Sequence, residues 1–162
     1  MKNYLFLLVL FIPVLILQIL TDRFLTFNYI GPDLILIMVV YITLSSGLIK
    51  GSILAFIFGF IYDIVSGGIL GISMFSLTLA SFISGLFYNQ NKKSLFFSSY
   101  KFVLIVLISA LISSFFKSLL ESNKLPLNIV SLIIEYGLIP AVYTSALSVP
   151  IIIFTPKNRL EI

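Results

Sequence analysis

The sequence predicts an all-α integral membrane protein, a single bundle of about six transmembrane helices. Three observations predict this class: hydrophobic residues make up 60% of the 162-residue chain, charged residues make up only 10%, and the mean hydropathy is +1.19. An ordinary soluble domain is about half apolar and about a quarter charged. In water this chain would expose large apolar surfaces, so we expect it to fold in a lipid bilayer without a separate soluble domain.

Apolar runs define the expected spans, because a membrane-crossing helix needs about 20 mostly apolar residues. The first run follows one lysine, as in a signal peptide, but no small-residue cleavage site comes after it. We therefore expect a retained helix that is kinked at Pro13. The last run contains Pro140 and Pro150, and five spans with one re-entrant segment are the alternative to six. The expected spans of this single domain are residues 4–21, 32–48, 50–66, 69–88, 98–120 and 126–154.

The distribution of basic residues predicts the orientation. If the amino terminus is cytoplasmic, the inner side carries Lys2, Lys50, Lys92, Lys93, Lys101, Lys157 and Arg159, and the outer side carries only Arg23, Lys117 and Lys124. This asymmetry follows the positive-inside rule, so both termini are expected in the cytoplasm. The net charge of +4 therefore indicates orientation and not nucleic-acid binding.

The chain lacks the residues on which most catalytic and metal sites depend. It contains no Cys and no His, which removes disulfides, thiolate nucleophiles and histidine-based metal sites. We find no phosphate-binding glycine loop and no nucleophile elbow, and the six acidic residues are spread along the chain. We therefore expect no catalytic residue, no cofactor and no metal, and a lipid-modifying enzyme would lack a catalytic group.

The stretch GSILAFIFGFIYDIVSGGILG, residues 51–71, has small side chains at every fourth position, at Gly51, Ala55 and Gly59. We call these three residues the small-residue row. Residues four apart lie on one face of a helix, and small residues on that face let two helices approach closely. The row therefore predicts a close helix contact. The contact lies either within the bundle, which is the commoner case, or with a partner protein.

The same face continues to Asp63, which lies about 18 Å along the helix from Gly51. This spacing places the acid in the outer part of the membrane, near the end of its helix, where the helix dipole opposes an anion. Two interpretations stay open: a helix end that reaches water, and a buried hydrogen bond or ion pair. We also hypothesise a polar cluster of Asp63, Lys117 and Glu135 at similar depth, against the alternative that Lys117 extends to the interface.

Two further segments are explained by local structure. Asp33 follows Pro32 at the start of the second expected helix, and a proline and a carboxylate both favour a helix start. The segment SGGILG, residues 66–71, is expected to be a turn on the outer side. In it, Gly67 and Gly71 would adopt backbone conformations that other residues resist. Both segments are expected to shape the side of the bundle that carries the small-residue row.

These motifs resemble the family of rod shape-determining protein MreD. The resemblance rests on a PDL helix start at residues 32–34, a G-x-x-x-[AG]-x-x-x-G-x-x-x-D helix at residues 51–63, and an SG-x-x-LG turn at residues 66–71. The ending IPAVYTSALSVPIIIF, the chain length and the basic tail are also similar. The resemblance covers most of the chain and is strongest over residues 32–86.

The resemblance implies a non-enzymatic, multi-pass scaffold of the cell-wall elongation machinery in the bacterial inner membrane. Such proteins bind MreC and help link MreB filaments to RodA and its transpeptidase partner, in contact with membrane lipid; a homo-oligomer stays open. Their fold is similar to the six-helix substrate-binding subunits of energy-coupling-factor transporters. This similarity supplies the alternative function, a vitamin-type substrate-binding subunit, although the chain has no Trp or His to line a pocket.

Overall fold

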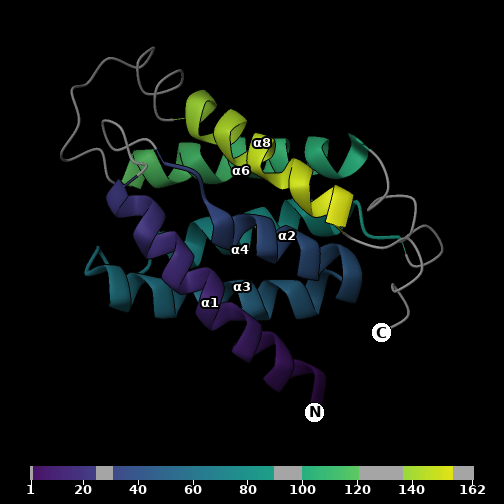
Figure 1. Ribbon diagram of the computed structural model, residues 1–162, viewed down its shortest axis with the longest axis horizontal. Coiled ribbons are helices and arrows are strands. Elements are labelled where there is room, and N and C mark those ends of the chain that lie inside the picture. The colour runs from purple at the N-terminus through teal and green to yellow at the C-terminus, as the bar shows by residue number, and fades with distance from the viewer. Residues whose placement is uncertain (1, 25–30, 90–99, 121–136, 155–162) are drawn as a thin grey trace.

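The computed structural model describes residues 2–24, 31–89, 100–120 and 137–154, and these residues form helices and turns without a strand (Figure 1). The helices are α1 (Lys2–Phe24), α2 (Leu34–Ser46), α3 (Leu48–Ser66), α4 (Ile72–Leu86), α6 (Tyr100–Leu120) and α8 (Ile139–Phe154). The expected all-helical class is thereby confirmed for the described residues. The first part of the sixth expected span, residues 126–136, lies outside them.

The helices have the composition of a membrane bundle. By length and composition, α3 and α6 could each cross a membrane, and α2 and α4 are shorter apolar helices. Large apolar side chains such as Ile53, Phe56 and Leu104 are about half exposed on the outside of the bundle. Exposed apolar surface on several helices is unfavourable in water and suits lipid. Six spans and their boundaries in the membrane stay a prediction.

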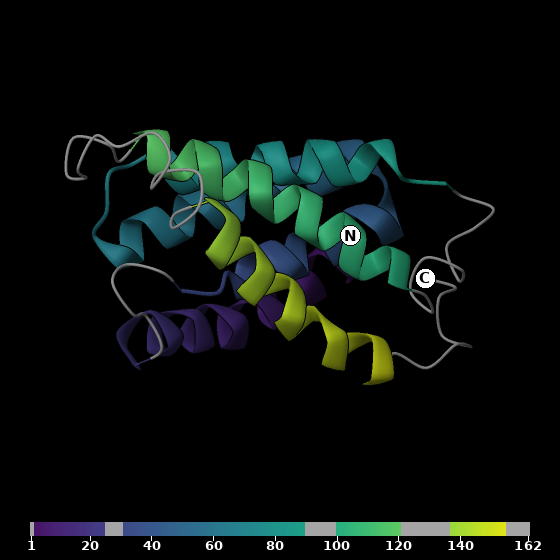
Figure 2. The same ribbon diagram turned by 90° about the horizontal axis from the view of Figure 1, so that it is seen from above.

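Helix α2 lies at the centre of the bundle. Its segment LILIMVVYIT is almost wholly apolar, which is typical of a helix that is covered on all sides. It packs against α1, α3, α4, α6 and α8, and Ile35, Val39 and Val40 are at most 1% exposed. In the view turned by 90° (Figure 2), α3, α4 and α6 lie on one side of α2, and α1 and α8 lie on the other.

Short connections hold α3 between α2 and α4. Gly47 alone separates α2 from α3. The turn between α3 and α4 contains Gly67, with a φ of 67°, and Gly71, with a φ of 103°. A Cβ atom added to either glycine would have open space around it, so the left-handed backbone conformation is what favours glycine here. The two glycines let α4 turn back along α3.

Candidate functional site

The small-residue row of α3 faces two neighbouring helices of the same chain. A Cβ atom added to Gly51 would lie 2.8 Å from the Cα atom of Thr43 on α2. A Cβ atom added to Gly59 would lie 2.5 Å from the Cα atom of Met74 on α4. Ala55, between the two glycines, is fully buried. The row therefore brings the backbone of α3 against the backbones of α2 and α4, which larger side chains would prevent.

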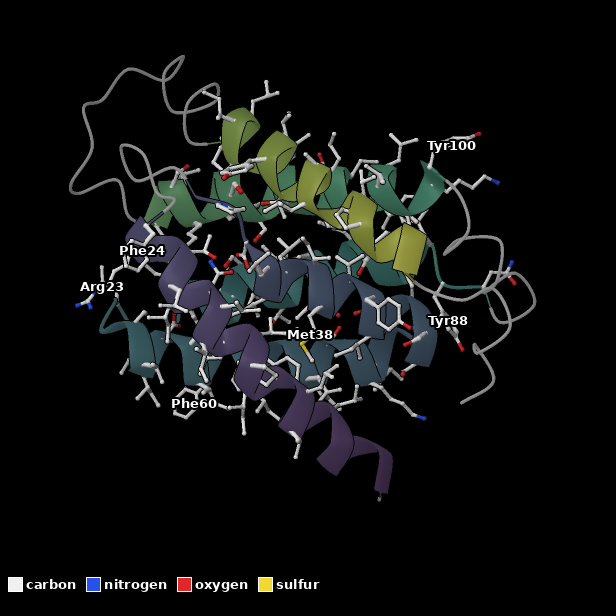
Figure 3. The ribbon with its side chains drawn as sticks, in the orientation of Figure 1. Arg23, Phe24, Met38, Phe60, Tyr88 and Tyr100 are labelled. Carbon is white, nitrogen blue, oxygen red and sulfur yellow. The ribbon has the colours of Figure 1, made fainter. Side chains whose placement is uncertain are left out.

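The outward face of α3 differs in kind from the row. It presents large side chains, and Phe60, labelled in Figure 3, points away from the bundle. In lipid, close helix association favours small residues, so a face of Ile and Phe is typical of contact with acyl chains. In this structure the row is covered by its own chain. Its use as a partner interface stays a prediction.

Close packing continues at the other end of the α3–α4 pair. A Cβ atom added to Gly85 of α4 would lie 2.8 Å from the Cβ atom of Leu48 of α3. Between the ends, the hydroxyl oxygens of Thr43 and Ser81 lie 2.8 Å apart and join α2 to α4. Small and hydroxyl side chains thus set the separation of α2, α3 and α4 along their length.

Asp63 follows the row as a buried hydrogen-bond acceptor. Its side chain is only 3% exposed. Its Oδ2 atom accepts from the backbone N–H of Gly71 at 2.8 Å and of Met74 at 3.4 Å, and its Oδ1 atom accepts from that of Ser73 at 3.1 Å. N–H groups at the start of a helix have no partner within the helix. Asp63 therefore caps α4 from the helix that precedes it.

This placement explains why an acid is stable near the end of α3. The negative end of the α3 dipole opposes a carboxylate, but the positive amino end of α4 attracts it, and three N–H groups point at it. Gly71, the N-cap residue of α4, has no side chain that could accept these bonds. Of the two interpretations of Asp63, the structure therefore has the buried hydrogen bonds, not a side chain in water.

Pro32 and Asp33 stand at the start of the buried helix α2. Asp33 is the N-cap residue, and its Oδ1 atom accepts from the N–H of Leu36 at 2.9 Å. The N–H of Asp33 donates to Oγ1 of Thr144 on α8 at 3.0 Å. Unsatisfied backbone groups are costly inside a membrane protein, where water is scarce. Side chains therefore complete the first turn of α2.

Gln18 of α1 completes the same turn from the other side. Its Nε2 atom donates to the carbonyl oxygen of Pro32 at 3.0 Å and to Oδ1 of Asp22 at 2.9 Å. Its Oε1 atom accepts from the N–H of Leu34 at 2.6 Å. The hydroxyl of Tyr62 on α3 donates to Oδ2 of Asp22 at 2.7 Å. One amide side chain thus joins α1 to α2, and Asp22 joins the pair to α3.

Lys117 of α6 contributes a positive charge to this end of the bundle. Its Nζ atom lies 5.5 Å from the ring centroid of Tyr62, within cation–π range. The hydrogen-bond partners of Asp63 are instead the N–H groups of α4, and Glu135 lies outside the described residues. We define the polar network as the side chains that are linked to the first turn of α2 directly or through one another: Gln18, Asp22, Asp33, Tyr62, Lys117 and Thr144.

Sequence reasoning missed four members of this network. Gln18 and Asp22 carried a usable signal, because they lie four residues apart on one face of an apolar helix, and polar groups of membrane helices face inward. Tyr62 and Thr144 carried none, since a tyrosine or threonine in an apolar helix is compatible with either face. Among the described residues, no group of three or more acids could hold a metal ion. The network joins helices by hydrogen bonds and charge.

Replacement of Asp33 tests the start of α2. We expect Asp33→Ala to lower the free energy of unfolding by about 1 kcal/mol, because the N–H of Leu36 loses its acceptor. Asp33→Asn keeps an oxygen in the same place and should stay close to the wild type. Thermal unfolding of the detergent-purified protein, followed by circular dichroism, measures both. Equal losses in the two variants would show that the charge matters and the hydrogen bond does not.

The fold and the site define a class of protein: a helical membrane bundle whose buried helix ends are capped by side chains of neighbouring helices. A family model described as rod shape-determining protein MreD matches residues 1–154. The chain therefore belongs to the MreD family, and the resemblance inferred from the motifs is confirmed. Comparisons with curated proteins and with solved structures gave no match.

Family membership gives a role in the determination of rod shape and a place in the membrane of the bacterial cell envelope. The family is one of shape-determining structural proteins and not a known enzyme family. The expected similarity to substrate-binding subunits of energy-coupling-factor transporters stays a prediction.

Proposed function

We propose that this chain is a non-enzymatic scaffold of the cell-wall elongation machinery in the bacterial inner membrane. In this role it binds MreC directly and links MreB filaments to RodA and its transpeptidase partner, the peptidoglycan synthases. The observation that carries the proposal is the family match, which extends over residues 1–154 and so includes every described helix.

The arrangement of polar and apolar groups supports a scaffold. Buried Asp63 accepts hydrogen bonds from the start of α4, so the acid and this helix start satisfy each other within the chain. Gln18 and Asp33 accept hydrogen bonds from the start of α2. Among the described residues, large apolar side chains are exposed on α1, α3, α4, α6 and α8. Such a bundle keeps its shape through internal contacts and offers its outer surface to lipid and to partner helices.

The charges of the described residues support an orientation with both termini in the cytoplasm. Exposed Lys50 and Lys101 lie in the first turns of α3 and α6, whereas Arg23 and Lys117 lie in the last turns of α1 and α6. Figure 3 shows Arg23 and Tyr100 at opposite ends of the bundle. With the Lys50 end inside, the α2–α3 connection faces the compartment that contains MreB filaments.

Affinity purification from native membranes tests the proposed function. We expect the tagged chain, extracted in mild detergent, to enrich MreC and to carry RodA and its transpeptidase partner with it, as quantified by mass spectrometry. An unrelated tagged membrane protein of similar size is the control for detergent carry-over. Recovery of ATP-binding transporter subunits with a tightly bound small molecule, in place of these proteins, would contradict the proposal and favour the vitamin-type subunit.

A further inference from the structure

Helix α1 is joined to the bundle differently from the other described helices. Its sequence, KNYLFLLVLFIPVLILQILTDRF, contains no Gly, Ala or Ser. Thr21 is its only small side chain, so α1 has no row of small residues like the one that brings α3 against α2 and α4. Figure 1 shows α1 running beside the start of α2 and obliquely across α3, with its amino-terminal end beyond α3.

Side-chain packing holds the middle of α1. The ring of Phe11 stacks on the ring of Phe58 of α3, with centroids 4.1 Å apart and an interplanar angle of 3°. On the other face of α1, Ile12, Ile16 and Leu17 are each more than half exposed. Stacked rings in lipid give contact area without the specificity of hydrogen bonds, because acyl chains offer comparable contacts.

The specific attachment of α1 lies in its last two turns. Gln18 makes three hydrogen bonds, two of them to the backbone at the start of α2, and Asp22 accepts from the hydroxyl of Tyr62. A single side-chain hydrogen bond between membrane helices contributes little to stability, because separated helices also find hydrogen-bond partners. A partner that offered alternative bonds could therefore displace these contacts. Pro13 lies between Phe11 and Gln18 and removes one backbone hydrogen bond of the helix there.

We propose that α1 is an arm whose position is set by a latch, formed by Gln18, Asp22 and Tyr62, while α2, α3, α4 and α6 form the body against which it moves. With the latch closed, α1 covers Phe58 and completes the first turn of α2. With the latch open, α1 tilts away at its Arg23 end, and Phe58 and the first turn of α2 become accessible. The device would let a partner that engages α1 alter the start of the central helix.

Distances between spin labels test the latch, and the absence of native cysteine simplifies the labelling. One label pair joins the arm to the body through Phe24→Cys and Ile64→Cys, both at exposed positions near the latch end of their helices. A second pair, Ile53→Cys and Phe82→Cys, lies within the body at exposed positions of α3 and α4. The measurement is double electron–electron resonance on the full chain in lipid nanodiscs.

Two variants open the latch to different degrees. Tyr62→Phe removes the hydroxyl that binds Asp22 and keeps the ring beside Lys117, whereas Gln18→Leu removes three hydrogen bonds at once. We expect a longer arm-to-body distance to appear in Tyr62→Phe and to predominate in Gln18→Leu. The distance within the body should stay unchanged in both.

The outcome separates a latch from a general support of the fold. If the arm-to-body distribution of both variants equals that of the wild type, the proposal is wrong. If the distance distributions of both label pairs broaden equally, the contacts stabilise the whole bundle and the proposal is also wrong. These readouts do not depend on MreC, so the latch and the proposed scaffold function can fail independently.

Discussion

Gly59→Leu is expected to lower the free energy of unfolding by roughly 3 kcal/mol. Even a Cβ atom at this position would lie 2.5 Å from the Cα atom and 2.7 Å from the N atom of Met74, closer than non-bonded atoms approach. The obstacle is the backbone of α4, which cannot rotate away as a flexible side chain can. The helices must separate, and the cap that Asp63 forms on α4 would be strained with them. Thermal unfolding of the purified protein in detergent measures the loss.

The chain offers a matched control in Gly68→Leu. Gly68 is exposed, and a Cβ atom there would have only Ser66 Oγ nearby, at 3.5 Å. The same substitution should therefore leave the unfolding temperature near that of the wild type. A Gly59→Leu protein as stable as Gly68→Leu would contradict the contact between α3 and α4. If it also lost MreC in affinity purification while remaining fully folded, the small-residue row would be a partner surface.

The sequence predicted that the small-residue row makes a close contact, but not with which helices. Spacing along one helix identifies the face that is small, because that property is local. It contains no information about the segment that will lie opposite. The structure shows that Gly51 meets α2 and Gly59 meets α4, so one row serves two neighbours. This division depends on the crossing of three helices and could not be read from α3 alone.

The two acids at helix ends show the same limit. Asp33 could be assigned from sequence, because a cap acts on a residue three positions further along the chain. Asp63 could not, because its donors are eight to eleven residues away and depend on the course of the intervening turn. Within its own helix, Asp63 lies where the helix dipole opposes a negative charge. Considered with the next helix, it lies where a negative charge is stabilised.

The motifs of residues 32–71 identify the family, although they do not identify the polar network. The PDL start, the row that leads to Asp63 and the glycine turn are three short patterns in fixed order, and together they indicated the MreD family that matches residues 1–154. Gln18 and Asp22 of α1 are not among the site residues predicted from the sequence. Their importance arises from the start of α2, to which Gln18 is hydrogen-bonded.

Asp63→Ala is expected to destabilise the protein by about 3 kcal/mol, because three backbone N–H groups at the start of α4 lose their acceptor together. The loss should exceed that of Asp33→Ala, where a single side-chain hydrogen bond is removed. Asp63→Asn should fall between the wild type and Asp63→Ala. Its single carbonyl oxygen can accept, but its NH2 group then faces another N–H donor. Thermal unfolding under one set of detergent conditions ranks the three variants.

The counter-charge of Asp63 can be identified by a double-mutant cycle with Lys117. If the amino end of α4 stabilises the carboxylate, Asp63→Asn and Lys117→Met should act independently, and their effects on the free energy of unfolding should add. If Lys117 were the partner, the double variant would lose clearly less than the sum of the two single variants. The hydrogen bonds of Asp63 to α4 and the position of Lys117 beside Tyr62 favour additivity. Strong coupling would overturn this account and restore the Asp63–Lys117 pair. A buried acid in a membrane bundle therefore does not require a buried base, because an unpaired helix start supplies both hydrogen-bond donors and positive potential.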